Sequence, residues 1–151
     1  MTDLALFWSD QLLSADVAIA GADLATDEGL RTAVIVSLFT DARAHDDDAL
    51  PDGADRRGWW GDAVADVAGD RTGSRLWLFR RAKNLRTVIE DFRQAVAEAL
   101  AWLVEDGIAR SVEVTAEARD RQTLAFAVEI RRRDGAAERH DFVWEATADA
   151  V

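Results

Sequence analysis

Residues 84–107, with the sequence NLRTVIEDFRQAVAEALAWLVEDG, carry the pattern that decides the fold. Apolar side chains recur there at intervals of three and four residues, which predicts one long amphipathic helix. The apolar positions are Leu85, Val88, Ile89, Phe92, Val96, Leu100, Leu103 and Val104. Asn84 is a suitable N-cap, because its side-chain oxygen can accept a hydrogen bond from a free backbone amide. Asp106-Gly107 is expected to end the helix, since glycine readily adopts the left-handed conformation common there.

The spacing of apolar residues changes from helical to alternating beyond this helix. Residues 112–118 (VEVTAEA) and 124–131 (LAFAVEIR) have a period of two, which is typical of strands with one buried face. Asp134-Gly135 predicts a tight turn before a third strand, whose aromatic face would contain His140, Phe142 and Trp144. We therefore expect a three-stranded antiparallel meander at the C-terminus, with one face packed on the long helix.

The segment before residue 42 predicts short strands and a second helix. Short apolar runs at residues 4–8 and 16–20 are separated by polar residues, as in a pair of short strands. The oxygen-bearing residues within Thr26-Asp27-Glu28-Gly29 can cap a helix start, so a buried helix is expected over residues 28–41. The β-branched run Val34-Ile35-Val36 leaves a core strand open as the alternative.

The composition of the chain fits one folded domain. With 151 residues, 49% hydrophobic and 31% charged, it can bury a substantial core. We expect a single α+β domain over residues 1–151. Its order is N-terminal short strands, a buried helix, a long irregular tryptophan-bearing loop, one long helix and the C-terminal meander. No apolar run approaches the roughly 20 residues that span a bilayer, so we expect no membrane association and synthesis in the cytoplasm.

Charge and residue types argue against several classes of function. A net charge of −11 argues against a nucleic-acid partner, because phosphate contacts need a basic surface. Nine acids lie within residues 41–70 and seven bases within residues 71–93, so these segments are either solvated faces or docking patches that fix orientation. Without cysteine there is no thiolate zinc site or thiol nucleophile. Asp46-Asp47-Asp48 lacks the spread of ligands of an EF-hand loop and is expected to be a solvated acidic loop.

No known catalytic motif stands out in the sequence. Neither a Gly-x-Ser-x-Gly turn nor a P-loop occurs. Glu90 and Glu98 lie about 12 Å apart by helical rise, too far for the carboxylate pair of a glycosidase. We therefore predict no catalytic, cofactor or metal site and no small-molecule substrate.

The loop over residues 42–75 contains the most unusual segment, Gly58-Trp59-Trp60-Gly61-Asp62. Loops longer than about 12–15 residues are uncommon in compact domains unless they are functional or disordered. Each indole offers roughly 150–250 Å² of mostly apolar area, so two exposed indoles would form a large patch. Either the indoles fill the protein's own core, with the glycines allowing a tight backbone path, or at least one anchors a partner beside Arg56 and Arg57.

Five segments in this order strongly resemble the baseplate proteins of Mu-like phage tails, and the resemblance covers nearly the whole chain. They are residues 30–41 (LRTAVIVSLFTD), 50–51 (LP), 57–62 (RGWWGD), 73–78 (GSRLWL) and 98–103 (EALAWL). The family is more distantly similar to the baseplate wedge and sheath-initiator group of T-even-like phages, which is also labelled lysozyme-like. That group carries a Glu-Pro-Arg motif after its long helix, where this chain reads Val104-Glu105-Asp106-Gly107-Ile108.

The resemblance implies a structural, non-enzymatic wedge subunit of a contractile tail baseplate. Its expected location is the virion tail, and its expected partners are other baseplate proteins and sheath proteins, with a homo-oligomer as a further option. The alternatives are a peptidoglycan-cleaving, lysozyme-like enzyme of the tail and a small ligand-binding module. The candidate interaction or structural loop comprises Arg56, Arg57, Gly58, Trp59, Trp60, Gly61, Asp62, Arg75 and Trp77.

Overall fold

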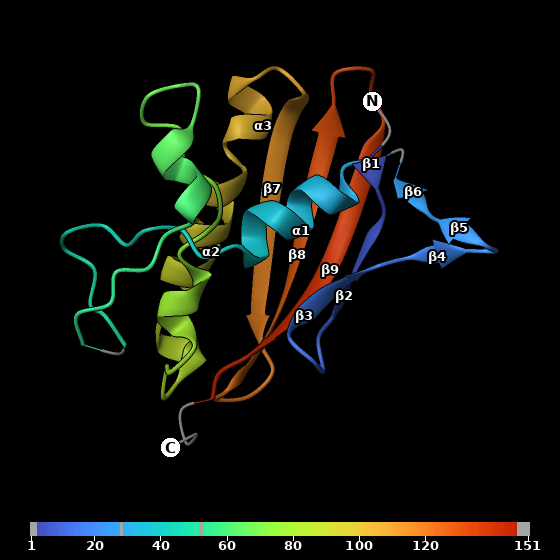
Figure 1. Cartoon of the computed structure of the whole chain (residues 1–151). Coiled ribbons are helices and arrows are strands. Elements are labelled where there is room, and N and C mark those ends of the chain that lie inside the picture. The colour runs from blue at the N-terminus through green and yellow to red at the C-terminus, as the bar shows by residue number, and fades with distance from the viewer. Residues whose placement is uncertain (1–2, 28, 52, 148–151) are drawn as a thin grey trace.

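A computed structural model describes residues 3–27, 29–51 and 53–147, and its fold is α+β as predicted. Strands β7 (Ala109–Ala118), β8 (Thr123–Arg132) and β9 (Ala137–Glu145) form an antiparallel sheet in the order β7-β8-β9. The helices lie together over one face of this sheet (Figure 1). The predicted C-terminal meander is therefore confirmed, and alternation along each strand buries one set of side chains against the helices.

The predicted long helix is divided into three consecutive helical pieces. They are the 3₁₀ turn η3 (Leu85–Thr87), α2 (Ile89–Leu100) and α3 (Trp102–Glu105). Asn84 is a cap as predicted, but it accepts from the Arg86 amide and so caps the 3₁₀ turn. Beyond α2 the apolar stripe rotates. Val104 is 42% exposed, whereas the indole of Trp102 is half-buried and donates to the Ser37 hydroxyl at 3.1 Å.

The second predicted helix is α1 (Arg31–Phe39), so the alternative of a core strand at Val34-Ile35-Val36 is wrong. Its predicted local cap is also wrong, because Thr26–Asp27 forms strand β6 and no side-chain cap is present at Leu30. The Leu30 amide instead donates to a carboxylate oxygen of Glu138, which lies in β9. Glu28, the remaining acid of the expected cap, lies outside the described residues.

One hydrophobic cluster joins the helices to the inner face of the sheet. Phe92 of α2 lies at its centre with no exposed surface, and its ring meets those of Phe79, Phe126 and Trp144 edge-on at 5.3–5.7 Å. Such edge-to-face arrangements are favourable because the positive ring edge meets the negative ring face. The core therefore connects α2, the sheet and the 3₁₀ turn η2 (Leu76–Phe79), which follows the tryptophan-bearing loop.

The N-terminal strands form a three-armed β element over residues 3–27, here called the N-terminal arm. Its three antiparallel strand pairs are β1 (Asp3–Leu4) with β6 (Thr26–Asp27), β2 (Leu6–Ser9) with β3 (Ser14–Val17), and β4 (Ile19–Ala20) with β5 (Asp23–Leu24). At the junction the backbones of three alanines close a cycle of hydrogen bonds. Ala5 donates to Ala25 at 2.8 Å, Ala25 to Ala18 at 2.8 Å, and Ala18 to Ala5 at 2.9 Å.

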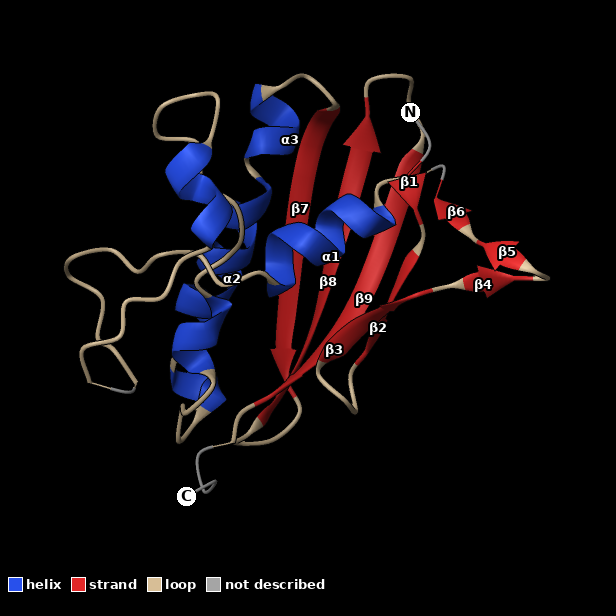
Figure 2. Ribbon diagram, viewed as in Figure 1, coloured by secondary structure: helices blue, strands red, loops and turns tan. Residues whose placement is uncertain are grey.

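Short strands were predicted for this segment and are confirmed, but each predicted run is divided between two strand pairs. The β4–β5 hairpin projects furthest from the sheet (Figure 2). Within the described residues, no helix has both the length and the apolar character to cross a bilayer.

Candidate interaction loop

The irregular loop between α1 and η2 is closed at its base by backbone hydrogen bonds. The Ala42 amide donates to the Ser74 carbonyl, and the Ser74 amide donates to the Thr40 carbonyl, both at 2.9 Å. The buried Ser74 hydroxyl also donates to the Leu38 carbonyl at the end of α1. The two ends of this long loop are thus held together, so the loop begins and ends at the same hydrogen-bonded site.

Gly73 is required at this closure. Its φ is +105°, and a Cβ atom placed there would lie 2.3 Å from the carbonyl oxygen of Thr40. Both the left-handed backbone and the close approach exclude larger residues. This explains why glycine precedes serine in the segment Gly73-Ser74-Arg75-Leu76-Trp77.

Trp77 and Arg57 brace the loop from inside. The Trp77 side chain is 2% exposed, and its indole N–H donates to the Ala42 carbonyl at 2.8 Å. The Arg57 guanidinium lies 5.0 Å from the centroid of the Trp77 ring and donates to a carboxylate oxygen of Asp41 at 2.7 Å. Arg57 is therefore held between an indole face and a carboxylate, which suits its planar cation.

Arg75 joins the loop to α2 through two carboxylates. One of its terminal nitrogens lies 2.8 and 2.9 Å from the two Asp48 oxygens, and the other lies 2.6 Å from Glu98. Partial burial opposes ionisation of Asp48. Hydrogen bonds from Arg75 and from the His45 amide outweigh it and hold the pKa of Asp48 below its ordinary value. The acidic and basic segments seen in the sequence therefore meet each other here within one chain.

Arg56 and Asp62 stabilise the loop backbone. Arg56 donates to the carbonyls of His45 and Asp46 at 2.7 and 3.3 Å. Asp62 accepts from the Thr72 amide at 2.9 Å across the loop. Asp46 is exposed to solvent as predicted, whereas Asp48 forms the ion pair with Arg75 described above.

His45, Asp47 and Asp48 could place one ligand atom each within 4.8 Å of the others, the one such group within the described parts of the chain. Both oxygens of Asp48 already accept from Arg75, and the imidazole of His45 lies 3.5 Å from Glu98. The arrangement fits an ion-pair network of the loop, and it gives no support to a cation site.

Trp59 and Trp60 point outward, so the interpretation that both fill the core is wrong. Trp59 is 41% exposed and Trp60 is 78% exposed, with ring centroids 5.4 Å apart. Gly61 is the buried residue of the segment, because the Trp59 ring folds over it and leaves no room for a Cβ atom. Gly58 is exposed and links Arg57 to this pair.

Two further apolar side chains extend the exposed surface beyond the tryptophans. The 3₁₀ turn η1 (Trp60–Val64) and the bend after it expose 74% of Val64 and 66% of Val67. Neither valine was predicted to lie at the surface, although short apolar residues among aspartates and glycines were the available signal. Trp59, Trp60, Val64 and Val67 are together called the apolar loop surface.

Apart from the two glycines, the nine predicted residues separate into two sets. Arg56, Arg57, Asp62, Arg75 and Trp77 make contacts within the chain, whereas Trp59 and Trp60 lie on its surface. Sequence reasoning missed the carboxylates that hold the arginines, Asp41, Asp48 and Glu98, because ion-pair partners far apart in sequence carry no local signal.

The fold and this loop define the class of the protein, a small α+β protein with exposed apolar side chains on a braced surface loop. The chain belongs to the phage protein GP46 family, whose family model matches residues 30–137. It is 42% identical over 143 residues to baseplate protein gp46 of Escherichia phage Mu, an alignment covering 94% of this chain and 95% of that protein. It is 37% identical over 142 residues to Mu-like prophage FluMu protein gp46 of Haemophilus influenzae, covering 94% and 96%. The resemblance to Mu-like baseplate proteins inferred from the sequence is thereby confirmed.

Proposed function

We propose that this protein is a structural subunit of the baseplate of a contractile phage tail, in the position of a wedge component. The name of the Mu relative, baseplate protein gp46, supports a place in the baseplate, and the aligned lengths are nearly complete. The wedge position and the contractile tail rest on the more distant resemblance to wedge and sheath-initiator proteins. The chain works as one domain through protein–protein contacts, and its partners are other baseplate proteins and the sheath.

The observation that carries this proposal is the contrast between a loop held by many internal contacts and its exposed apolar loop surface. Trp60 has 78% of its surface exposed, yet the loop beneath it is held by a buried serine, two arginine ion pairs and a buried indole. Preorganised aromatic side chains are the residues that dominate binding energy at protein interfaces. A loop fixed in this way loses little conformational entropy when a partner covers it.

Co-expression with the adjacent tail proteins of the same phage tests this function. The expected result is a complex that contains this chain and at least one other tail protein. The Trp60→Ala variant should weaken that complex at least tenfold, while Leu12→Ala, which truncates an equally exposed side chain on the N-terminal arm, should not. A chain that stays free when all of its neighbours are present would contradict the proposal.

The lysozyme-like alternative makes a different prediction and is tested separately. On a gel containing purified peptidoglycan, a structural subunit leaves the substrate intact. Clearing that disappears when a single carboxylate is replaced would show an enzyme and would overturn the proposal of a purely structural role.

A further inference from the structure

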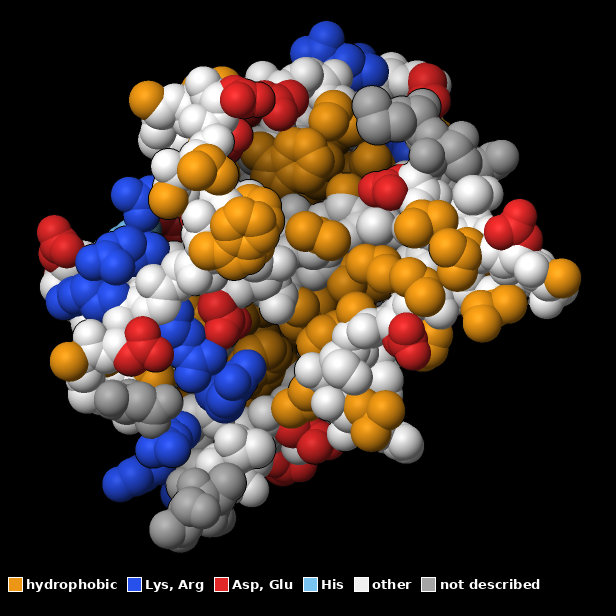
Figure 3. Space-filling view, viewed as in Figure 1, with side chains coloured by type: hydrophobic (Ala, Val, Ile, Leu, Met, Phe, Trp, Pro, Cys, Tyr) orange, Lys and Arg blue, Asp and Glu red, His pale blue; other side chains and the backbone are white. Residues whose placement is uncertain are grey.

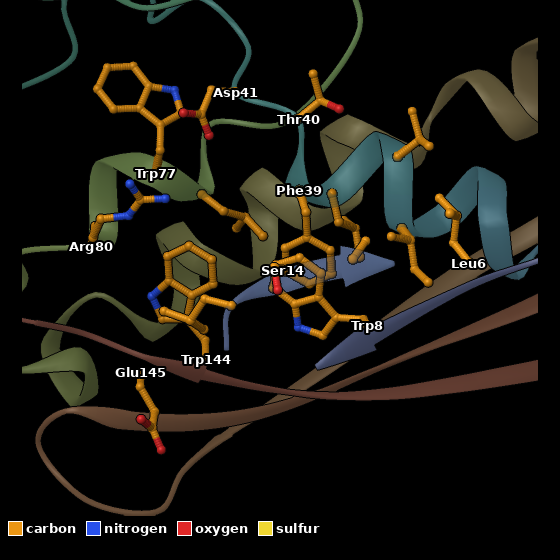
Figure 4. A pocket seen from close by; sticks show the side chains of 16 residues that line it. Leu6, Trp8, Ser14, Phe39, Thr40, Asp41, Trp77, Arg80, Trp144 and Glu145 are labelled. Carbon is orange, nitrogen blue, oxygen red and sulfur yellow. The ribbon is translucent and has the colours of Figure 1, made fainter. Parts of the chain in front are cut away.

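A groove with a volume of about 270 Å³ lies against α1. It is bounded by α1, the β2–β3 hairpin, η2 and the end of β9, and we call it the tryptophan groove (Figure 4). Trp8 stacks on Phe39 with ring centroids 3.6 Å apart, and Trp77 and Trp144 complete the aromatic lining. Eleven of its sixteen lining residues are apolar, so an occupant would bring apolar side chains.

Arg80 places a positive charge at the rim of the groove. Its exposed side chain extends beside Trp77 (Figure 4), and within the described residues it has no ion pair. Asp41 also lines the groove but is occupied by Arg57, and the side chain of Glu145 points away from it (Figure 4). The groove therefore fits an occupant that brings apolar side chains and one negative charge.

The N-terminal arm of the same chain has this chemistry. Residues 3–27 contain five acids and no lysine, arginine or histidine. In the β4–β5 hairpin, Ile19 pairs across the strands with Leu24, and these side chains are 73% and 44% exposed. Asp23 lies beside them in β5 and is exposed. Hydrophobic side chains gather along this projecting arm at the right of Figure 3.

We propose that the β4–β5 hairpin of one copy of this protein docks in the tryptophan groove of a second copy. Ile19 and Leu24 contact the aromatic lining, and Asp23 pairs with Arg80 of the other copy. The contact joins two different surfaces, so it is head-to-tail and builds rings or open chains of copies.

Sedimentation equilibrium of the purified full-length chain tests this contact. We expect association that increases with protein concentration. Ile19→Asp should weaken association at least tenfold by placing a charge in an apolar groove. The matched control is Leu12→Asp, since Leu12 is 76% exposed at the β2–β3 turn and belongs to neither contact surface.

Charge reversal tests the assigned pair of residues. Asp23→Arg and Arg80→Asp should each weaken association, and the chain carrying both changes should recover to within threefold of the parent. Asp16→Arg is the matched control for the hairpin change, because Asp16 is also exposed and also accepts from the amide of the next residue. Combined with Arg80→Asp, it should give no recovery.

Several outcomes would overturn the proposal. A chain that remains monomeric at every concentration shows that copies do not bind each other, and the groove would then serve another protein or none. If Ile19→Asp leaves association unchanged, the copies meet through another surface. The same holds if the double charge reversal associates no more strongly than the single changes. Circular dichroism of each variant separates these results from loss of folding.

Discussion

Replacing Trp60 of the loop and Trp77 of η2, one at a time, gives the sharpest test of the site. Trp77 is 2% exposed, so nearly all of roughly 200 Å² is buried, which at about 25 cal/mol per Å² stabilises the fold by about 5 kcal/mol. Trp60 is 78% exposed, so about a fifth of a similar area is buried, equivalent to about 1 kcal/mol. Trp77→Ala should therefore cost about 3–5 kcal/mol of unfolding free energy, and Trp60→Ala about 1 kcal/mol or less.

Urea denaturation followed by circular dichroism measures both free energies, and co-purification with the tail partners measures assembly. Trp60→Ala should fold normally and lose the partner, whereas Trp77→Ala should unfold at lower urea. Equal losses of stability in the two variants would refute the assignment of one indole to the interior and the other to the surface. Normal stability together with normal assembly for Trp60→Ala would show that the exposed indole has no role in binding.

Three further predictions follow from the loop contacts. Gly73→Ala should destabilise the protein by several kcal/mol in thermal unfolding, because the added Cβ would meet a backbone carbonyl and a φ of +105° disfavours any side chain. A change below about 1 kcal/mol would contradict the close approach of Gly73 to Thr40 at the base of the loop. Gly61→Ala should move the Trp59 ring, at a smaller cost in stability and with altered tryptophan fluorescence; an unchanged spectrum would mean that the ring does not cover this glycine. The pKa of Asp48 is lowered in the folded state, so its ion pair with Arg75 stabilises the protein above the unfolded pKa, near 4, and is lost as pH falls below it. The stability difference between the parent and Asp48→Asn should accordingly be present at pH 7 and shrink below about pH 4, and a difference that is constant down to pH 2 would be inconsistent with that pair.

Periodic patterns predicted the regular part of the fold because they depend on local geometry. The alternation in residues 112–118 and 124–131 led directly to β7 and β8, and the stripe from residue 85 onward led to the α2 segment. The break at Ala101 was missed, because it accompanies a contact between Trp102 and Ser37, two residues 65 positions apart. No local pattern contains that information.

The short N-terminal strands show a different limit of sequence patterns. Apolar runs at residues 4–8 and 16–20 predicted strands, but each run contains an alanine at the junction of the three strand pairs. Ala5, Ala18 and Ala25 exchange backbone hydrogen bonds there, and small side chains allow the three backbones to approach one another. A run of five residues does not reveal that its two halves pair with different partners.

The candidate loop was located from the sequence alone, because paired tryptophans between glycines are rare and chemically costly to expose. Sequence also established the α+β class and the family resemblance, since both depend on residue order. Only the tertiary structure decided which indoles lie inside. Trp77 is covered because Ala42 and Arg57, which are distant from it in the sequence, contact it in the fold. Trp59 and Trp60 have no such cover and are 41% and 78% exposed. Whether a side chain is buried depends on which distant segments pack around it. Residue type determines only how much its burial stabilises the fold.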